Sequence, residues 1–365
     1  MVTITIVITT ILKNNPLRYK AGYINIASCY SKKLNLLSKI CRLYFIGRIA
    51  CHVLQYNKDR VNTMKYLIAI PTYNGGKVWQ ESADGISEFN LNKAMVYVVD
   101  SGSKDDTLAI AEQHGFETLS IDSKDFNHGG TRNQAVENNI DRADVIIFLT
   151  QDAIPQQGFL DEITQVFNDP KVACAYGRQL PHKDANPLAK HARMFNYGAE
   201  GYTCEFKDKE KLGIKTVFTS NSFAAYRTSI FKELGGFPSN TILSEDMYFA
   251  AKAVMAGYKV GYCAGAEVRH SHNYTPIEEF KRYFDIGVFH YDESWIRDKF
   301  GGAGGEGMRF IKSELSFLLK NHPLWIPRAC VHNFLKIVGY KLGMKYSKIP
   351  RKWLPKLSMH SRFWK

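Results

Sequence analysis

Acidic side chains follow apolar runs at positions where buried strands would end. Asp100 comes directly after one run, and Asp152 comes two residues after another. The three apolar runs of this region are residues 65–70, 95–99 and 144–150. Strands separated by helical stretches predict a right-handed parallel sheet, whose carboxyl ends meet at one edge. A carboxylate there can accept a hydrogen bond from a ribose hydroxyl, or hold a divalent cation against two phosphates.

The same residues also have a purely structural interpretation. Asp100 and Asp105 lie in a loop rich in glycine and serine that leads into the helical stretch 108–114. Aspartate is common in turns and at helix N-termini, because its side chain accepts hydrogen bonds from nearby backbone N–H groups. Both interpretations of these two acids stay open from the residues alone.

A second acidic pair opens a later helix. Ser244, Glu245 and Asp246 precede the helical stretch 247–256. Ser244 has the residue type of an N-cap, and acids in a first helical turn are stabilised by the helix dipole. Capping alone would therefore explain both carboxylates.

Four segments in this order resemble the inverting family-2 glycosyltransferases of the GT-A fold. The segments are IPTYNGG at 70–76, VVDSGSKDDT at 98–107, TQDAIP at 150–155 and SEDMYFAAKAVMAGYKVGY at 244–262. The resemblance extends from about residue 65 to the C-terminus, and the Thr-Gln-Asp-Ala form resembles the rhamnosyltransferase branch. It implies an α/β fold with a Rossmann-like, mostly parallel sheet flanked by helices.

The resemblance also implies a donor site and a metal site. The implied nucleotide-binding residues are Pro71, Thr72, Tyr73, Asn74, Asp100, Ser101, Arg132, Gln151 and Asp152. Asp152 would also bind a divalent metal, Mg or Mn. The sequence departs from the family's two-carboxylate form, since Gln151 and Ala153 flank this acid, so another ligand is required. We assign that role to His270 and expect His272 to be packed or exposed to solvent.

Asp246 matches the family's catalytic base, with Glu245 beside it. Inverting transfer requires one carboxylate to take a proton as the acceptor hydroxyl attacks the anomeric carbon. We expect this carboxylate to be ionised at neutral pH without a large change in its pKa.

The segment at residues 125–135 resembles a loop of the rhamnosyltransferase-like enzymes. Arg132 would open a helix there and offer planar donors to a pyrimidine or a phosphate. Gly129 and Gly130 would allow the ligand to approach the backbone closely.

Charge is distributed unevenly along the chain. Residues 1–63 carry a net charge of +9, residues 64–319 carry −7 and residues 320–365 carry +11. A nucleic-acid-binding protein would concentrate its positive charge on the folded body, so this class is not favoured. Basic ends favour an anionic membrane surface. The seven cysteines form no Cys-x-x-Cys pair, which indicates a reducing cytoplasm.

Residues 1–63 carry no predicted catalytic role. They form a basic extension that is disordered, lies at a membrane interface, or is an over-extended gene start before Met64. The catalytic domain is assigned to residues 64–280. Residues 281–365 are predicted to be helical and basic, and either to associate with a membrane or to pack as an ordinary helical subdomain.

The sequence therefore predicts an inverting glycosyltransferase, peripheral at the inner face of the cell membrane. The resemblance implies transfer of L-rhamnose from dTDP-rhamnose to a lipid-linked or oligosaccharide acceptor in O-antigen, capsule or other surface polysaccharide synthesis. One alternative is a different nucleotide-sugar donor. Two others are a sugar nucleotidyltransferase and a glycan-binding scaffold protein of the same fold.

Overall fold

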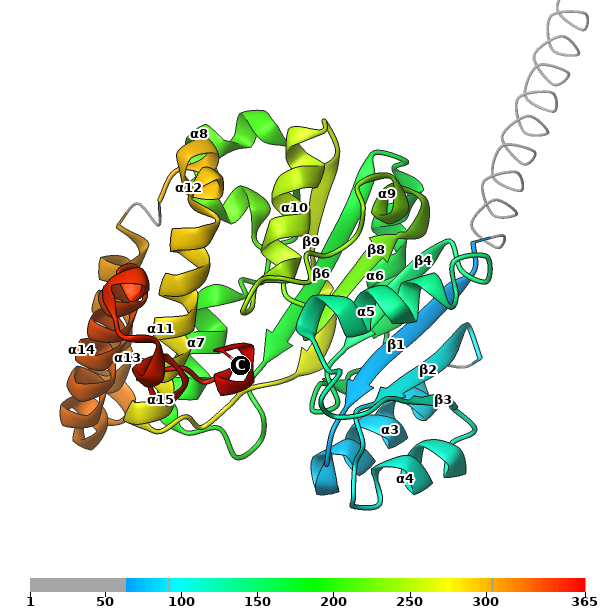
Figure 1. The fold of residues 1–365 in the computed structure, drawn as a ribbon, viewed down its shortest axis with the longest axis horizontal. Coiled ribbons are helices and arrows are strands. Elements are labelled where there is room, and N and C mark those ends of the chain that lie inside the picture. Colours follow the sequence, from blue (N-terminus) through cyan, green and yellow to red (C-terminus); the bar gives the residue numbers. More distant parts are fainter. Residues whose placement is uncertain (1–63, 91, 303–304, 365) are drawn as a thin grey trace, which may run out of the picture. The chain divides into compact units, whose positions relative to one another are not determined.

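The structure is a computed structural model that describes residues 64–90, 92–302 and 305–364 (Figure 1). Residues 64–365 form one compact unit. The predictions for residues 1–63 lie outside the described residues. Among the described helices, none combines the length and the apolar character needed to cross a membrane.

One mixed sheet forms the centre of this unit. Its strand order is β3-β2-β1-β4-β8-β6-β9-β5, and β7 pairs with β9. The strands are β1 (Tyr66–Thr72), β2 (Ala94–Asp100), β3 (Glu117–Ser120), β4 (Val145–Leu149), β5 (Ile154–Pro155), β6 (Val172–Leu180), β7 (Tyr202–Cys204), β8 (Phe223–Arg227) and β9 (Lys259–Arg269). Parallel pairing joins β3, β2, β1 and β4, as predicted. Beyond β4 the sheet is mixed, because β8 runs antiparallel to both of its neighbours.

Helices cover both faces of the sheet, because its central strands are apolar throughout. In β1, Leu67 and Ala69 face one core, while Ile68 and Ile70 face the other. Helices α5 (His128–Glu137), α9 (Thr228–Glu233) and α10 (Glu245–Met255) cover the first face, and α3 (Gly76–Asn90), α4 (Thr107–Gln113) and α6 (Phe159–Thr164) cover the second. The predicted α/β fold is confirmed.

The strand register brings the predicted site loops to one edge of the sheet. The last residue of β4, Leu149, pairs with the first residue of β8, Phe223. At the same edge, β6 and β9 end together, with Leu180 opposite Arg269. The antiparallel direction of β8 therefore places the loop before it, rather than the loop after it, beside Asp152.

The C-terminal region is helical. Its helices are α11 (Pro276–Asp292), α12 (Ser294–Phe300), α13 (Glu306–Asn321), α14 (Ile326–Gly343) and α15 (Leu354–Leu357). A Cβ atom added to Gly343 of α14 would lie 2.0 Å from the carbonyl oxygen of Phe284 in α11. The two helix backbones are thus in direct contact. Helix α7 (Pro187–Asn196) shares a small core with α13 and α14 through Leu188, Leu318 and Ala329.

Candidate active site

Asp100 lies beneath the loop that follows β2. Its carboxylate accepts hydrogen bonds from the hydroxyls of Thr72 and Ser103 and from the backbone N–H groups of Gly102 and Ser103. These four bonds occupy the acceptor sites of a fully buried carboxylate. The geometry matches the structural interpretation of Asp100, which fixes the shape of the loop.

The predicted donor loops are held to one another by side chains. Asn74 accepts a hydrogen bond from the backbone N–H of Lys104, at 2.8 Å, and so joins the loops after β1 and β2. Gln151 accepts from the backbone N–H of Tyr73 at 2.8 Å and donates to the Tyr73 carbonyl at 3.2 Å. Pro71 and Thr72 end β1, and the Ser101 hydroxyl is buried with no partner among the described residues. Gln151 therefore links the first loop to the Asp152 segment.

Asp152, His270 and His272 come together at the edge of the sheet. Each offers one ligand atom, and these atoms lie within 4.8 Å of one another. The Asp152 carboxylate lies 3.5 Å from Nε2 of His270 and 3.7 Å from Nε2 of His272. His272 was predicted to be packed or exposed. Instead it is half-buried beside the acid, because the chain after β9 returns its side chain to the same point.

The protonation states of this triad suit a divalent cation. Burial lowers the pKa of His270, and burial together with His270 lowers the pKa of His272 to about 3. Burial alone would raise the pKa of Asp152, but the two histidines hold it below its usual range. An ionised carboxylate and two neutral imidazoles are suitable ligands for Mg or Mn.

Gln179 orients His270 for this role. Nδ1 of His270 lies 2.9 Å from Oε1 of Gln179, and the Gln179 amide donates to the Ser220 hydroxyl at 2.9 Å. Since an amide oxygen only accepts, Nδ1 carries the proton and Nε2 directs a lone pair towards Asp152. Two acceptors facing each other across 3.5 Å leave the space between them suited to a cation.

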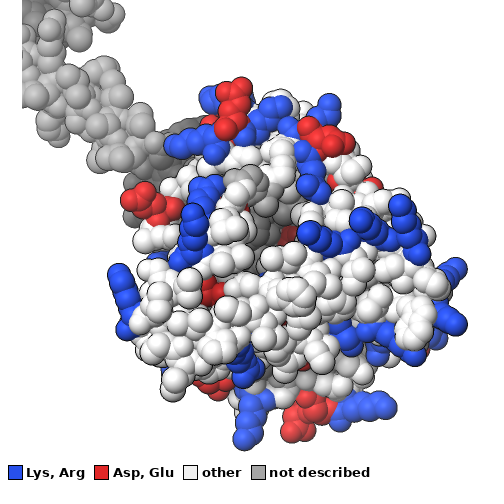
Figure 2. Space-filling view, turned by 90° about the vertical axis from the view of Figure 1, so that its left-hand side faces the viewer, with Lys and Arg blue, Asp and Glu red and all other residues white. Residues whose placement is uncertain are grey.

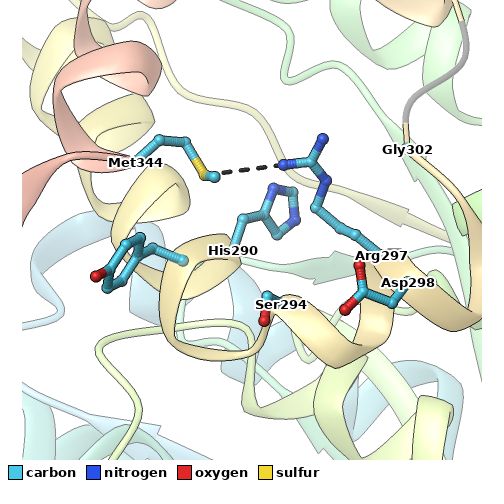
Figure 3. Close-up of a pocket in the computed structure, with 7 residues that line it drawn as sticks. His290, Ser294, Arg297, Asp298, Gly302 and Met344 are labelled. Carbon is cyan, nitrogen blue, oxygen red and sulfur yellow. Dashed lines mark hydrogen bonds between the residues drawn. The ribbon is translucent and has the colours of Figure 1, made fainter.

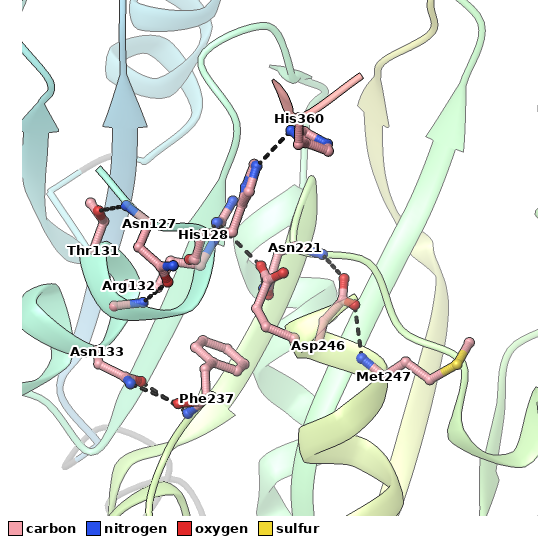
Figure 4. A network of polar contacts seen from close by, with 12 residues as sticks. Asn127, His128, Thr131, Arg132, Asn133, Asn221, Phe237, Asp246, Met247 and His360 are labelled. Carbon is pink, nitrogen blue, oxygen red and sulfur yellow. Dashed lines mark hydrogen bonds and ion pairs between the residues drawn. The ribbon is translucent and has the colours of Figure 1, made fainter. Parts of the chain in front are cut away.

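Asp246 is held by the loop before β8. Its carboxylate accepts from the backbone N–H of Asn221 at 2.9 Å and from the backbone N–H of Met247 at 2.8 Å (Figure 4). The Asn221 side chain donates to Glu245 at 2.9 Å and accepts from the buried hydroxyl of Tyr226 at 2.7 Å. A single asparagine thus fixes both acids at the start of α10.

Capping does not explain this acidic pair. Ser244 has a left-handed conformation, with φ of 60°, and its side chain makes no capping hydrogen bond. Glu245 forms a buried ion pair with Arg132 at 3.2 Å, and both side chains are 7% exposed. Ser244 thus occupies the predicted N-cap position and both acids lie in the first turn, but the Ser244 side chain does not cap the helix and Glu245 has a separate ion-pair partner.

The charge on Glu245 changes the chemistry of its neighbour. Burial would raise the pKa of Glu245, but Arg132 and His128 lower it, so this group stays ionised. Burial and the negative charge of Glu245 together raise the pKa of Asp246 to about 7, against the hydrogen bonds that it accepts. The expectation of an unshifted pKa for Asp246 is therefore wrong, because the sequence does not reveal how deeply the pair is enclosed.

The 125–135 loop is also placed differently from its prediction. Arg132 points into the protein, where it pairs with Glu245 and donates to the carbonyl of His128 at 2.9 Å. A Cβ atom on Gly129 would lie 2.0 Å from the carbonyl oxygen of Pro238. The close approach at Gly129 is therefore to the chain itself.

One path of contacts connects the triad to Asp246. It runs from Asp152 through His270 and Gln179 to Ser220, and the next residue, Asn221, binds Asp246. Asn221 and Gln179 were not predicted as site residues, because an amide in a loop or a strand carries no distinctive spacing.

Two arginines from separate helices lie near the triad. Arg282 of α11 and His272 both contact the Tyr274 ring, with Cζ of Arg282 at 5.9 Å and the His272 ring at 5.0 Å from its centroid. The charges of Arg193 in α7 and of Arg282 both lower the pKa of His272, after burial and His270. Among the described residues, no carboxylate lies within 4.0 Å of either guanidinium. They are candidate anion-binding groups that motif spacing could not reveal.

A separate cavity of about 620 Å³ lies among α11, α12 and the end of α14 (Figure 3). His290, Ser294, Arg297 and Met344 are among its lining residues. None of the predicted site residues lines it, so this cavity is distinct from the edge of the sheet.

The family model described as glycosyl transferase family 2 matches residues 67–235. The chain is 56% identical over 303 residues to the O-antigen chain rhamnosyltransferase RfbN of Salmonella typhimurium, covering 82% of this chain and 96% of that protein. It is 52% identical over 301 residues to the O-antigen chain rhamnosyltransferase WbaN of Salmonella anatum, covering 82% and 95%. The chain belongs to glycosyltransferase family 2 and is a glycosyltransferase, which sets aside the nucleotidyltransferase and scaffold alternatives.

A solved structure shares the fold. It is the mannosyltransferase PcManGT from Pyrobaculum calidifontis in complex with GDP-Man and Mn2+, with a TM-score of 0.51 and 18% identity. The match covers 83% of this chain and 86% of that chain. The likeness supports the GT-A fold that the motifs implied.

Proposed function

We propose that the protein transfers L-rhamnose from dTDP-rhamnose to a lipid-linked or oligosaccharide acceptor in O-antigen synthesis, with inversion at the anomeric carbon. The observation that carries this proposal is the 56% identity to a rhamnosyltransferase over 96% of that protein's length. The geometry of the site supports it, since one path of contacts joins the half-buried carboxylate of Asp246 to a triad whose ligand atoms could bind a cation.

In this mechanism Asp246 is the base. The acceptor hydroxyl oxygen bonds to the anomeric carbon, its proton passes to the Asp246 carboxylate, and the bond from that carbon to the diphosphate breaks. The nucleoside diphosphate leaves with the bonding electrons. Asn221 keeps the carboxylate in place, and a pKa of about 7 makes it a stronger base than an ordinary aspartate.

Asp152, His270 and His272 would hold a divalent cation, Mg or Mn. When bound, such an ion neutralises charge on the departing diphosphate. Arg282 and Arg193 would add positive charge near the triad, which suits binding of the same diphosphate. Gln151 would keep the loop that carries Tyr73 beside this point.

A donor panel tests the proposal. The purified full chain is assayed with Mn2+ against dTDP-rhamnose, GDP-mannose and UDP-GlcNAc, with released nucleoside diphosphate as the readout. We expect release from dTDP-rhamnose alone, and loss of turnover with retained dTDP binding in Asp246→Asn. Release from another donor only would overturn the assignment of rhamnose, and full turnover by Asp246→Asn would overturn the role of the base.

We also place the enzyme at the cytoplasmic face of the membrane, through a surface that we call the C-terminal face. Its exposed apolar side chains come from α13, α14 and the turn between them: Leu315, Leu319, Leu324, Val331, Phe334 and Ile337. Leu324 is 92% exposed and Phe334 is 65% exposed. Apolar side chains exposed on two contacting helices are suited to the boundary between headgroups and acyl chains.

Positive charge borders this face. Exposed basic residues on the same elements are Lys312, Lys320, Arg328 and Lys341, with Lys345 shortly after α14, and no acid follows Glu314 in the sequence. Figure 2 shows a largely uncharged field bordered mostly by Lys and Arg side chains, with some Asp and Glu among them. Each basic residue near an anionic surface contributes about 1 kcal/mol. We therefore propose that this face binds anionic lipid.

Flotation with lipid vesicles tests this assignment. We expect the full chain to float with phosphatidylglycerol vesicles and not with phosphatidylcholine vesicles, and Leu324→Asp with Phe334→Asp to abolish flotation. Met255→Asp, at an exposed apolar residue of α10, is the matched control and should float normally. Absence of wild-type flotation, or flotation of the double variant, would overturn the assignment.

A further inference from the structure

The end of the chain is fixed against α11. The buried carboxylate of Asp285 accepts hydrogen bonds from the backbone N–H groups of Met359 and His360, at 2.9 and 3.0 Å. Trp364 packs on the ring of Tyr346, with centroids 5.4 Å apart. We call residues 358–364 the C-terminal strap. Its anchors at both ends give it a defined path, and Figure 1 shows the red end of the chain between the C-terminal helices and the strands.

The strap reaches the predicted donor loops. The imidazole of His360 lies 3.2 Å from that of His128, which is the first residue of α5 (Figure 4). Arg362 donates to the carbonyl oxygen of Ser123 at 3.1 Å, and its guanidinium carbon lies 5.8 Å from the centroid of the Tyr73 ring. Segments more than 230 residues apart in the sequence therefore meet at this point.

Tyr73 connects the strap to the triad. Its backbone exchanges two hydrogen bonds with Gln151, the residue next to Asp152. Its ring is 44% exposed and has Arg362 beside it. The Arg362 guanidinium thus lies beside Tyr73, and the backbone of Tyr73 is hydrogen-bonded to the residue that precedes the predicted metal ligand Asp152.

Arg362 has hydrogen-bonding capacity to spare. Among the described residues, no carboxylate lies within 4.0 Å of its guanidinium nitrogens, and its one hydrogen bond is to the Ser123 carbonyl. A guanidinium has five N–H donors in a planar fork that matches phosphate oxygens. An exposed, unpaired guanidinium beside an exposed aromatic ring suits an anionic ligand that also carries a planar base.

We infer that the C-terminal strap forms one wall of the donor site and that Arg362 binds the diphosphate of the nucleoside diphosphate donor. This inference rests on the proposed function, because it takes the donor to be a nucleotide sugar. It assigns residues 358–364 to substrate binding, whereas their basic composition alone indicated either a membrane contact or an ordinary helical subdomain.

Comparing the affinities of the full chain for dTDP and for thymidine tests whether Arg362 binds the diphosphate or only holds the strap in place. We expect Arg362→Ala to weaken dTDP binding about tenfold, the loss typical of one charge-assisted hydrogen bond to phosphate. Thymidine has no diphosphate, so the dissociation constant of its complex with Arg362→Ala should equal that with the wild type. Arg362→Lys should recover part of the dTDP affinity, and Arg351→Ala, at an exposed arginine outside the strap, should behave as wild type.

These measurements distinguish binding of the diphosphate by Arg362 from a purely structural role. Unchanged dTDP binding in Arg362→Ala, or equal weakening of dTDP and thymidine with a lower melting temperature, would show that Arg362 only holds the strap in place, and the inference would be wrong. Wild-type protein that binds no dTDP and releases no nucleoside diphosphate from any donor would instead refute the proposed function.

Discussion

Replacing Glu245 with glutamine should move the pH dependence of transfer towards acid. Burial and the charge of Glu245 raise the pKa of Asp246 to about 7. The substitution removes that charge but keeps the burial and the hydrogen-bonding capacity towards Asn221 and Arg132. A charge within a few ångströms changes a carboxyl pKa by roughly one to three pH units, and burial is the larger cause here, so we expect a fall of about one pH unit.

The shift is towards acid because Asp246 acts as the base. Asp246 must be ionised to accept a proton, so activity rises with pH through its pKa and reaches a plateau above it. At pH 6 the ionised fraction would increase from about one tenth in the wild type to about one half in Glu245→Gln. The measurement is kcat/KM from pH 5 to 9, each profile scaled to its own plateau, with Glu81→Gln on the surface of α3 as the control. An acid limb that stays in place, or moves to higher pH, would refute this account of the pair.

Three further predictions concern stability and metal binding. Arg132→Met leaves a buried carboxylate unpaired and should lower the free energy of unfolding by about 3–5 kcal/mol in urea titrations; a loss below about 1 kcal/mol would contradict the ion pair. Gly343→Ala places a Cβ atom 2.0 Å from a backbone oxygen and should cost at least about 1–3 kcal/mol, whereas Gly307→Ala, with nothing within 4 Å, should not destabilise the protein. His272→Ala should weaken Mn2+ binding about 10–100-fold in calorimetry, with His322→Ala as the control; equal affinity would remove His272 from the triad.

The positions of the loops could be predicted from the sequence because each buried strand is a short continuous run of apolar residues. The apolar runs before Asp100 and Asp152 became β2 and β4, and parallel pairing of β1, β2 and β4 put their ends at one edge. The motif that contains Glu245 and Asp246 forms α10, as expected from its helical pattern. These features depend on residues close together in the chain.

Contacts between distant segments could not be predicted in the same way. Arg132 was assigned to the donor, but the structure pairs it with Glu245, which lies 113 residues further along the chain. The pKa of Asp246 depends on that pair and on the depth of its burial, and neither has a sequence pattern. The contacts of His272 and of the C-terminal strap could not be predicted for the same reason, since a His-x-His spacing and a basic tail fit several environments.

The glycine contact between α11 and α14 has a mechanical consequence. With no layer of side chains between Gly343 and the Phe284 carbonyl, the two helices have little freedom to slide, and they should tilt together as one lever. The N-cap of α11 is Thr275, three residues after His272. A tilt of α14 should therefore also move the residue at which the chain that follows His272 enters α11.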